Sequence, residues 1–124
     1  MPEQGYRIAP VRLTANNLGS NGNIANNETF AAGTTSNICD ISAFNHLTLL
    51  YEDAATSTLD TLDVEISGNS AKYYKIATLT PAVRGSKREA ALQLDVRGIT
   101  NIRVKNASAG SNYTSVTCSA YGTA

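Results

Sequence analysis

The sequence predicts an all-β protein: an antiparallel β-sandwich or jelly roll of about seven or eight strands with an extended N-terminal arm. Three observations support this fold class. Short runs of alternating apolar and polar residues recur along the chain, and polar turn-forming stretches separate them at regular spacing. The composition is rich in Thr, Ser, Asn, Ala and Gly, low in charge, and free of Trp. A chain of 124 residues can bury one core without metal or disulfide staples.

The strongest alternation lies in Phe44–Leu79. Two breaks of hairpin length separate three alternating runs, which are Asn45–Asp53, Leu59–Ser67 and Lys72–Leu79. Because successive side chains of a strand point to opposite faces of a sheet, each run predicts a strand with one buried face.

The flanking segments predict the remaining strands. Ala90–Arg97 contains helix formers, but its alternation of Leu92, Leu94 and Val96 with polar residues favours a strand. Thr80–Arg88 carries Pro, Gly and three basic residues and is predicted to be a loop. The other predicted strands are Ser36–Ile41, Thr100–Asn106 and Tyr113–Tyr121.

We expect two antiparallel sheets packed about 10 Å apart. The expected core consists of the apolar members of these runs, which are Leu47, Leu49, Tyr51, Leu62, Val64, Ile66, Leu94, Val96, Ile102, Val104 and Val116.

Residues 1–35 differ from residues 36–124, so we expect an N-terminal arm, extended or partly disordered, followed by one sandwich domain. Pro10 limits the segment Tyr6–Thr14 to an edge strand or an arm, and a run of turn formers follows. Two interpretations stay open: a loose terminus, or an arm that docks on a neighbouring subunit. The apolar residues Ile8, Val11, Leu13 and Ile24 favour docking.

The charge balance argues against two classes of partner. Ten Lys and Arg offset ten Asp and Glu, whereas proteins that bind nucleic acid are normally basic. The same balance argues against electrostatic attachment to a membrane, and no apolar run reaches the roughly 18 residues of a membrane span. The N-terminus shows no apolar region typical of a signal peptide.

No residue pattern indicates catalysis, so we expect no enzyme activity, cofactor or metal. His46 is the only histidine, and no nucleophile-elbow motif accompanies it. The acidic residues around Glu52–Glu65 lack a calcium-loop spacing and are expected to be solvated strand ends. Cys39 and Cys118 are expected to be small buried residues, with a disulfide between them as the alternative. The basic residues Arg84, Lys87 and Arg88 are either solvated or face an acidic partner.

The order of segments resembles the small β-sandwich structural proteins of tailed-phage virions. The matching positions are Val64–Ser70, Tyr73–Leu79 and Asp95–Val104, after the entry SNICDISAFNHLTLLYED, and the resemblance spans about residues 36–121. It brings no catalytic residues.

This resemblance implies a capsid decoration (cement) protein, made in the host cytoplasm and placed on the virion surface. Its implied partners are the major capsid protein and further copies of the chain, as a homotrimer. The contact residues expected from the arm are Tyr6, Ile8, Val11, Leu13 and Phe30, with Arg84, Lys87 and Arg88 second. The alternatives are a tail, neck or fibre-associated virion subunit and a carbohydrate-binding β-sandwich module. The last predicts an exposed tyrosine cluster of Tyr73, Tyr74, Tyr113 and Tyr121.

Overall fold

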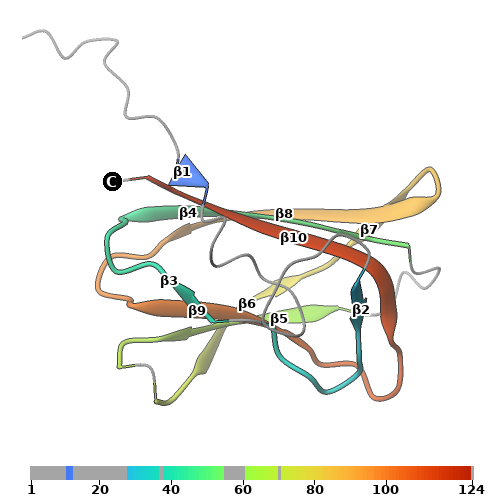
Figure 1. Cartoon of the computed structure of the whole chain (residues 1–124), viewed down its shortest axis with the longest axis horizontal. Coiled ribbons are helices and arrows are strands. Elements are labelled where there is room, and N and C mark those ends of the chain that lie inside the picture. Colours follow the sequence, from blue (N-terminus) through green and yellow to red (C-terminus); the bar gives the residue numbers. More distant parts are fainter. Residues whose placement is uncertain (1–10, 13–27, 37, 55–60, 70, 124) are drawn as a thin grey trace, which may run out of the picture.

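The computed structural model describes residues 11–12, 28–36, 38–54, 61–69 and 71–123. Within these residues the protein consists of strands and connections, without a helix, and the strands form two antiparallel sheets stacked as a sandwich (Figure 1). The predicted fold class is therefore confirmed. Since the described part of the chain has no helix, it contains none that could span a membrane.

The larger sheet has the strand order β1-β10-β4-β8-β7, and β2 also pairs with β10. Its strands are β1 (Val11–Arg12), β2 (Glu28–Phe30), β4 (His46–Asp53), β7 (Ala82–Arg84), β8 (Lys87–Asp95) and β10 (Tyr113–Thr123). The smaller sheet has the order β3-β9-β5-β6. Its strands are β3 (Cys39–Asp40), β5 (Leu62–Ser67), β6 (Tyr74–Leu79) and β9 (Asn101–Asn106).

The alternating residues fill the space between the sheets as predicted. On β4, Leu47, Leu49 and Tyr51 are buried, and on β9 Ile102 and Val104 are buried. Ile66 and Leu94 are only partly buried at the margin of the core. The core also holds residues absent from the predicted set, which are Phe30, Cys39, Ile41, Leu79, Tyr113, Cys118 and Ala120.

The prediction of a loop over Thr80–Arg88 is wrong. Ala82–Arg84 form β7, which pairs with Lys87–Glu89 of β8 across the two-residue turn Gly85–Ser86. Gly85 has a φ of 65°, a left-handed conformation that such hairpin turns require and that glycine adopts without strain. The resulting hairpin extends beyond the body of the sandwich (Figure 1).

The sandwich begins earlier in the chain than residue 36. In β2, Phe30 pairs with Tyr113 of β10, and its side chain is buried. Thr35 forms a bridge with Lys105, which places this segment beside β9. Residues 28–35, which were expected to belong to the arm, thus contribute a strand and a core side chain.

A buried ion pair lies among the central strands of the larger sheet. Arg88 donates from Nε to Asp53 Oδ1 at 2.9 Å and from Nη2 to Asp53 Oδ2 at 2.7 Å, and both side chains are fully buried. The Tyr51 hydroxyl donates to Asp53 Oδ2 at 2.7 Å. The Arg88 guanidinium lies 4.7 Å from the centre of the Tyr113 ring. These contacts satisfy the carboxylate from two strands and link β4, β8 and β10.

Replacing Asp53 with alanine should lower the free energy of unfolding by about 3–5 kcal/mol, because it leaves a buried guanidinium without its counter-charge. Urea unfolding followed by circular dichroism measures the change. Lys75→Ala is the matched control, since it breaks the exposed Lys75–Asp63 pair and should cost about 1 kcal/mol or less. Equal losses in the two variants would contradict a special role for the buried pair.

Candidate functional site

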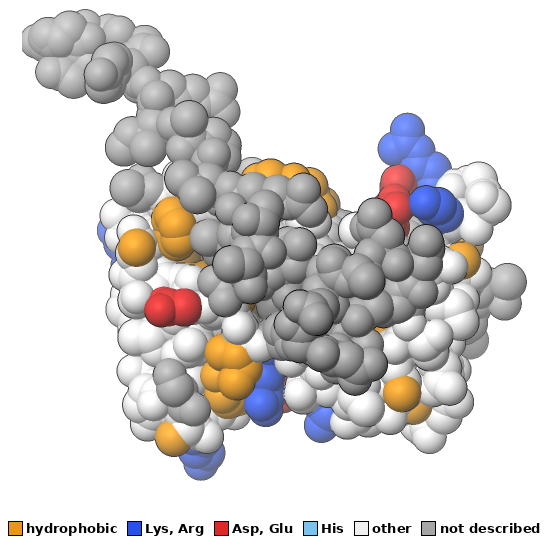
Figure 2. Space-filling view, in the orientation of Figure 1, with side chains coloured by type: hydrophobic (Ala, Val, Ile, Leu, Met, Phe, Trp, Pro, Cys, Tyr) orange, Lys and Arg blue, Asp and Glu red, His pale blue; other side chains and the backbone are white. Residues whose placement is uncertain are grey.

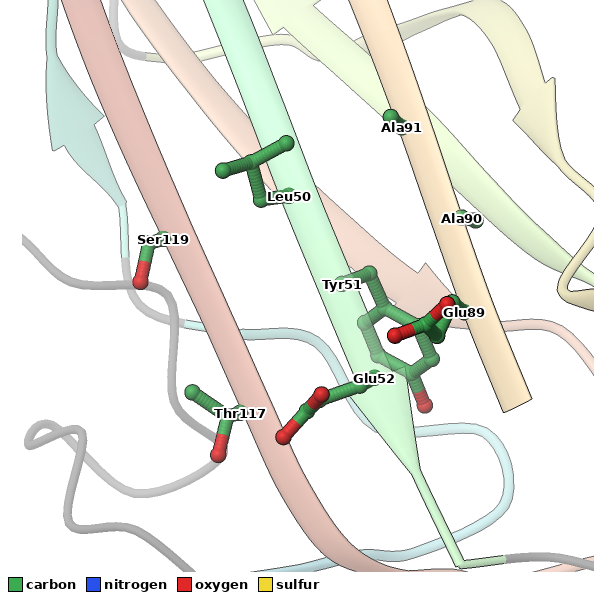
Figure 3. A pocket seen from close by; sticks show the side chains of 8 residues that line it. All are labelled: Leu50, Tyr51, Glu52, Glu89, Ala90, Ala91, Thr117 and Ser119. Atoms are coloured by element: carbon green, nitrogen blue, oxygen red, sulfur yellow. The ribbon is translucent and has the colours of Figure 1, made fainter. Parts of the chain in front are cut away.

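A hollow of about 430 Å³ lies over the larger sheet, on strands β4, β8 and β10. The register places Leu50 beside Ala91 and Ser119, so these three side chains share the outer face of the sheet, opposite to the core. Figure 3 shows Leu50 with its neighbours around this hollow. Leu50 is 44% exposed and gives the hollow an apolar floor, whereas Ser119 beside it is buried.

Charged side chains border one end of the hollow. Glu52 of β4 lies opposite Glu89 of β8 in the register, and both line the hollow. Each carboxylate has a cation from the β7–β8 hairpin: Lys87 Nζ is 3.0 Å from Glu52 Oε1, and Arg84 Nη1 is 3.6 Å from Glu89 Oε1. Basic and acidic side chains accordingly gather near the hairpin in Figure 2. The cations offset the repulsion between two facing carboxylates.

This arrangement suits binding of a protein segment. The floor is apolar and carries the hydroxyls of Thr117 and Ser119, and the rim offers both signs of charge. Binding sites of this kind hold an apolar anchor surrounded by polar contacts. Within the described residues, no group of three or more His, Cys, Asp or Glu side chains is placed to hold a metal ion.

The structure separates the residues predicted to contact a partner. Arg84 and Lys87 lie exposed on the hairpin, beside the hollow. Arg88 does not: it is buried against Asp53, because it occupies an inward position of β8. Phe30 is a core residue and not an exposed contact, because β2 aligns it with Tyr113.

Of the remaining arm residues predicted to contact a partner, the structure describes Val11. Val11 belongs to β1, which pairs with Tyr121 and Gly122 of β10. Tyr6, Ile8 and Leu13 lie outside the described residues.

Sequence reasoning missed Leu50. The alternation of β4 assigns Leu47, Leu49 and Tyr51 to the core and leaves Leu50 on the face shared by Thr48 and Glu52. A leucine on a face that otherwise carries polar residues is the signal in the sequence that could have identified this site.

The tyrosines do not form one exposed cluster. Tyr113 is buried, and Tyr121 lies on the larger sheet. Tyr74 is the first residue of β6 in the smaller sheet, and Tyr73 precedes it. Tyr74 is 58% exposed, and the Lys72 ammonium lies 5.2 Å from its ring centre. The Arg103 guanidinium stacks 3.9 Å from the Tyr73 ring centre and pairs with Glu65 at 2.7 Å. The four-tyrosine platform expected of a carbohydrate-binding module is therefore absent.

Comparisons with known proteins show the fold. No protein-family model matches the chain, and no curated protein matches its sequence. The K2 cleaved adhesin domain of Lys-gingipain (Kgp) is similar over 100% of this chain and 87% of that chain, with a TM-score of 0.60 and 12% identity. A mutant of a carbohydrate binding module of family 29 is similar over 94% of this chain and 93% of that chain, with a TM-score of 0.51 and 10% identity.

A third structure, the SPBc2 prophage-derived protein YomS, covers 80% of this chain and 96% of its own, with a TM-score of 0.48 and 16% identity. At this score the similarity carries no inference about function. At the identities of the first two structures, the shared β-sandwich is what the comparison establishes.

Cys39 and Cys118 are free and buried on the facing sheets. Burial raises the pKa of each thiol to about 12, because the apolar surroundings disfavour the thiolate. The charge of Asp40 adds to the rise in the pKa of Cys39, and the charge of Cys39 adds to the rise in the pKa of Cys118. The expectation that Cys39 and Cys118 are small buried residues is confirmed, and the two cysteines do not form a disulfide.

The folded protein should therefore resist iodoacetamide at pH 8, since the reactive thiolate is unpopulated in both side chains. Mass spectrometry should find neither cysteine alkylated after a short exposure, and both alkylated after the same exposure in concentrated urea. Rapid labelling of either residue in the folded protein would show that the core opens there.

Proposed function

We propose that this chain is a virion structural protein of the decoration type, which binds the outer shell of a capsid and bridges its subunits. The observation that carries the proposal is the hollow at Leu50, which has an apolar floor, a rim of paired charges and a rigid sheet beneath it. The sequence resemblance to small virion β-sandwich proteins supports the same role.

The hollow fits a protein partner better than a sugar. A partner would seat an apolar side chain on Leu50 and Ala91, and its polar groups would meet Glu52, Glu89, Lys87 and Arg84. Tyr51 is the aromatic residue of the lining, but its ring is buried and its hydroxyl is engaged by Asp53, so it offers no face for stacking. On a shell, many copies of one modest contact gain stability from the symmetry of the lattice.

The proposal predicts that Leu50→Glu blocks attachment to particles. A carboxylate on the floor of the hollow would lose the apolar contact and add a third negative charge beside Glu52 and Glu89, so occupancy should fall by about tenfold or more. The measurement is the copy number per purified particle, relative to the major shell protein. For the unaltered chain we expect on the order of hundreds of copies, in a ratio set by the shell symmetry.

Ile38→Glu is the matched control, because Ile38 is 46% exposed and lies before β3, on the other sheet. If the Leu50→Glu variant still attached to particles at full occupancy, the hollow would not be part of the interface. Tens of copies of the unaltered chain would favour a tail or neck location, and absence from particles would overturn the virion role.

A carbohydrate-binding module is the second candidate, and the exposed ring of Tyr74 is the observation that favours it. Tyr74 is the first residue of β6 and the Lys72 ammonium lies 5.2 Å from its ring centre, so a sugar ring could stack on Tyr74 and hydrogen-bond to Lys72. Glycan-array binding that Tyr74→Ala abolishes and Leu50→Glu leaves intact would establish this candidate over the first.

A further inference from the structure

Among the described residues, part of one edge of the larger sheet has no paired strand. β7 pairs with Lys87, Arg88 and Glu89, so it covers only the first third of β8. No strand among the described residues pairs with the rest of that edge, over residues 90–95.

The hydrogen-bonding groups of this edge follow from the register. Val96 donates from its backbone nitrogen to the Asn45 carbonyl at 2.8 Å, which identifies His46 and Asp95 as a non-hydrogen-bonded pair of the antiparallel ladder. The two-residue turn after Arg84 leads to the same assignment. Arg84 and Lys87 must bond to each other across such a turn, so the backbone groups of Lys87 and of every second residue after it point away from β4. The N–H and C=O groups of Ala91, Gln93 and Asp95 therefore point away from β4, toward the open edge.

This edge lacks the features that protect sheet edges. Natural edge strands are kept from pairing by shortness, bulges, proline or lysine. β6, the edge of the smaller sheet, carries Lys75, and its pairing with β5 is irregular where Val64 faces Ala77 and Glu65 faces Lys75. The open part of β8 contains no proline, lysine or bulge, and its inward residues Leu92 and Leu94 are only partly buried.

We infer that the open edge of β8 binds the same edge of a second copy, antiparallel about a two-fold axis at Gln93. This inference rests on the register and does not depend on the proposed function. In this arrangement Ala91 of each copy faces Asp95 of the other, and the two Gln93 residues face each other, so no like charges meet. On the inner face, Leu92 of each copy lies beside Leu94 of the other and gains the cover it lacks.

The arrangement is self-complementary, as a two-fold interface must be. Gln93 is the middle one of the three residues whose backbone groups face the open edge, so each edge presents the same groups to the other.

Analytical ultracentrifugation of the full chain tests association. The 13.1 kDa chain should sediment as a dimer with rising concentration. Gln93→Pro removes an N–H that points to the open edge, which the monomer tolerates, and should weaken dimerisation by about tenfold or more. Gln93→Ala, which keeps this N–H, is the matched control and should still dimerise. A monomer at every concentration up to about 1 mM, or equal dimerisation of the Gln93→Pro variant, would overturn the inference.

Oxidative cross-linking tests the register without weakening the fold. The two-fold axis brings the two Gln93 positions within reach of a disulfide, so Gln93→Cys should cross-link readily. Ala91→Cys lies on the same edge, but the register separates its two copies by four residues, about 13 Å, so it should not. The buried native thiols do not compete, because Cys39 and Cys118 are enclosed in the core. Equal cross-linking of the two variants would overturn the two-fold register.

Discussion

The buried pair of Asp53 and Arg88 determines which side chains of β8 point into the core and which point to the outer face of the larger sheet. An arginine can be buried only when its charge is matched, and Asp53 and the Tyr113 ring provide that match from β4 and β10. With Arg88 held inward, the two-residue period of a strand sends Lys87 and Glu89 outward. A slip of one residue in β8 would turn the Arg88 guanidinium to the outer face, leave Asp53 buried without its counter-charge and bury Glu89, so the pair also disfavours that register.

The same alternation along β8 places both the hollow and the open edge on this strand. Glu89 and Ala91 contribute the rim and floor of the hollow, and Ala91 also begins the run of residues whose backbone groups face the open edge. The two surfaces use different parts of the strand: side chains above the sheet for the hollow, and backbone groups in its plane for the edge. A partner on the hollow and a second copy on the edge would therefore approach from different directions.

The alternation in the sequence was enough to predict the sandwich and most of its core, because a period of two is a local property of each strand. The residues it misplaced depend on distant partners. Arg88 looked like a surface residue because its counter-charge, Asp53, lies 35 positions earlier. Phe30 looked like an arm residue because the strand that buries it, β10, lies at the far end of the chain. The hairpin at Gly85 was missed for a different reason: β7 has only three residues, too few for a pattern.

The edge strands of the two sheets differ in how well they are protected from pairing with another chain. β1 and β2, both from the N-terminal part of the chain, pair with the two ends of β10. β6 is irregular and charged, and β3 and β7 are too short to template another chain. Among the described residues, the open stretch of β8 combines half-covered leucines with none of these protective features. A role in which copies meet on a repeating surface would use such an edge, because each additional contact between neighbours adds to the avidity of the whole layer.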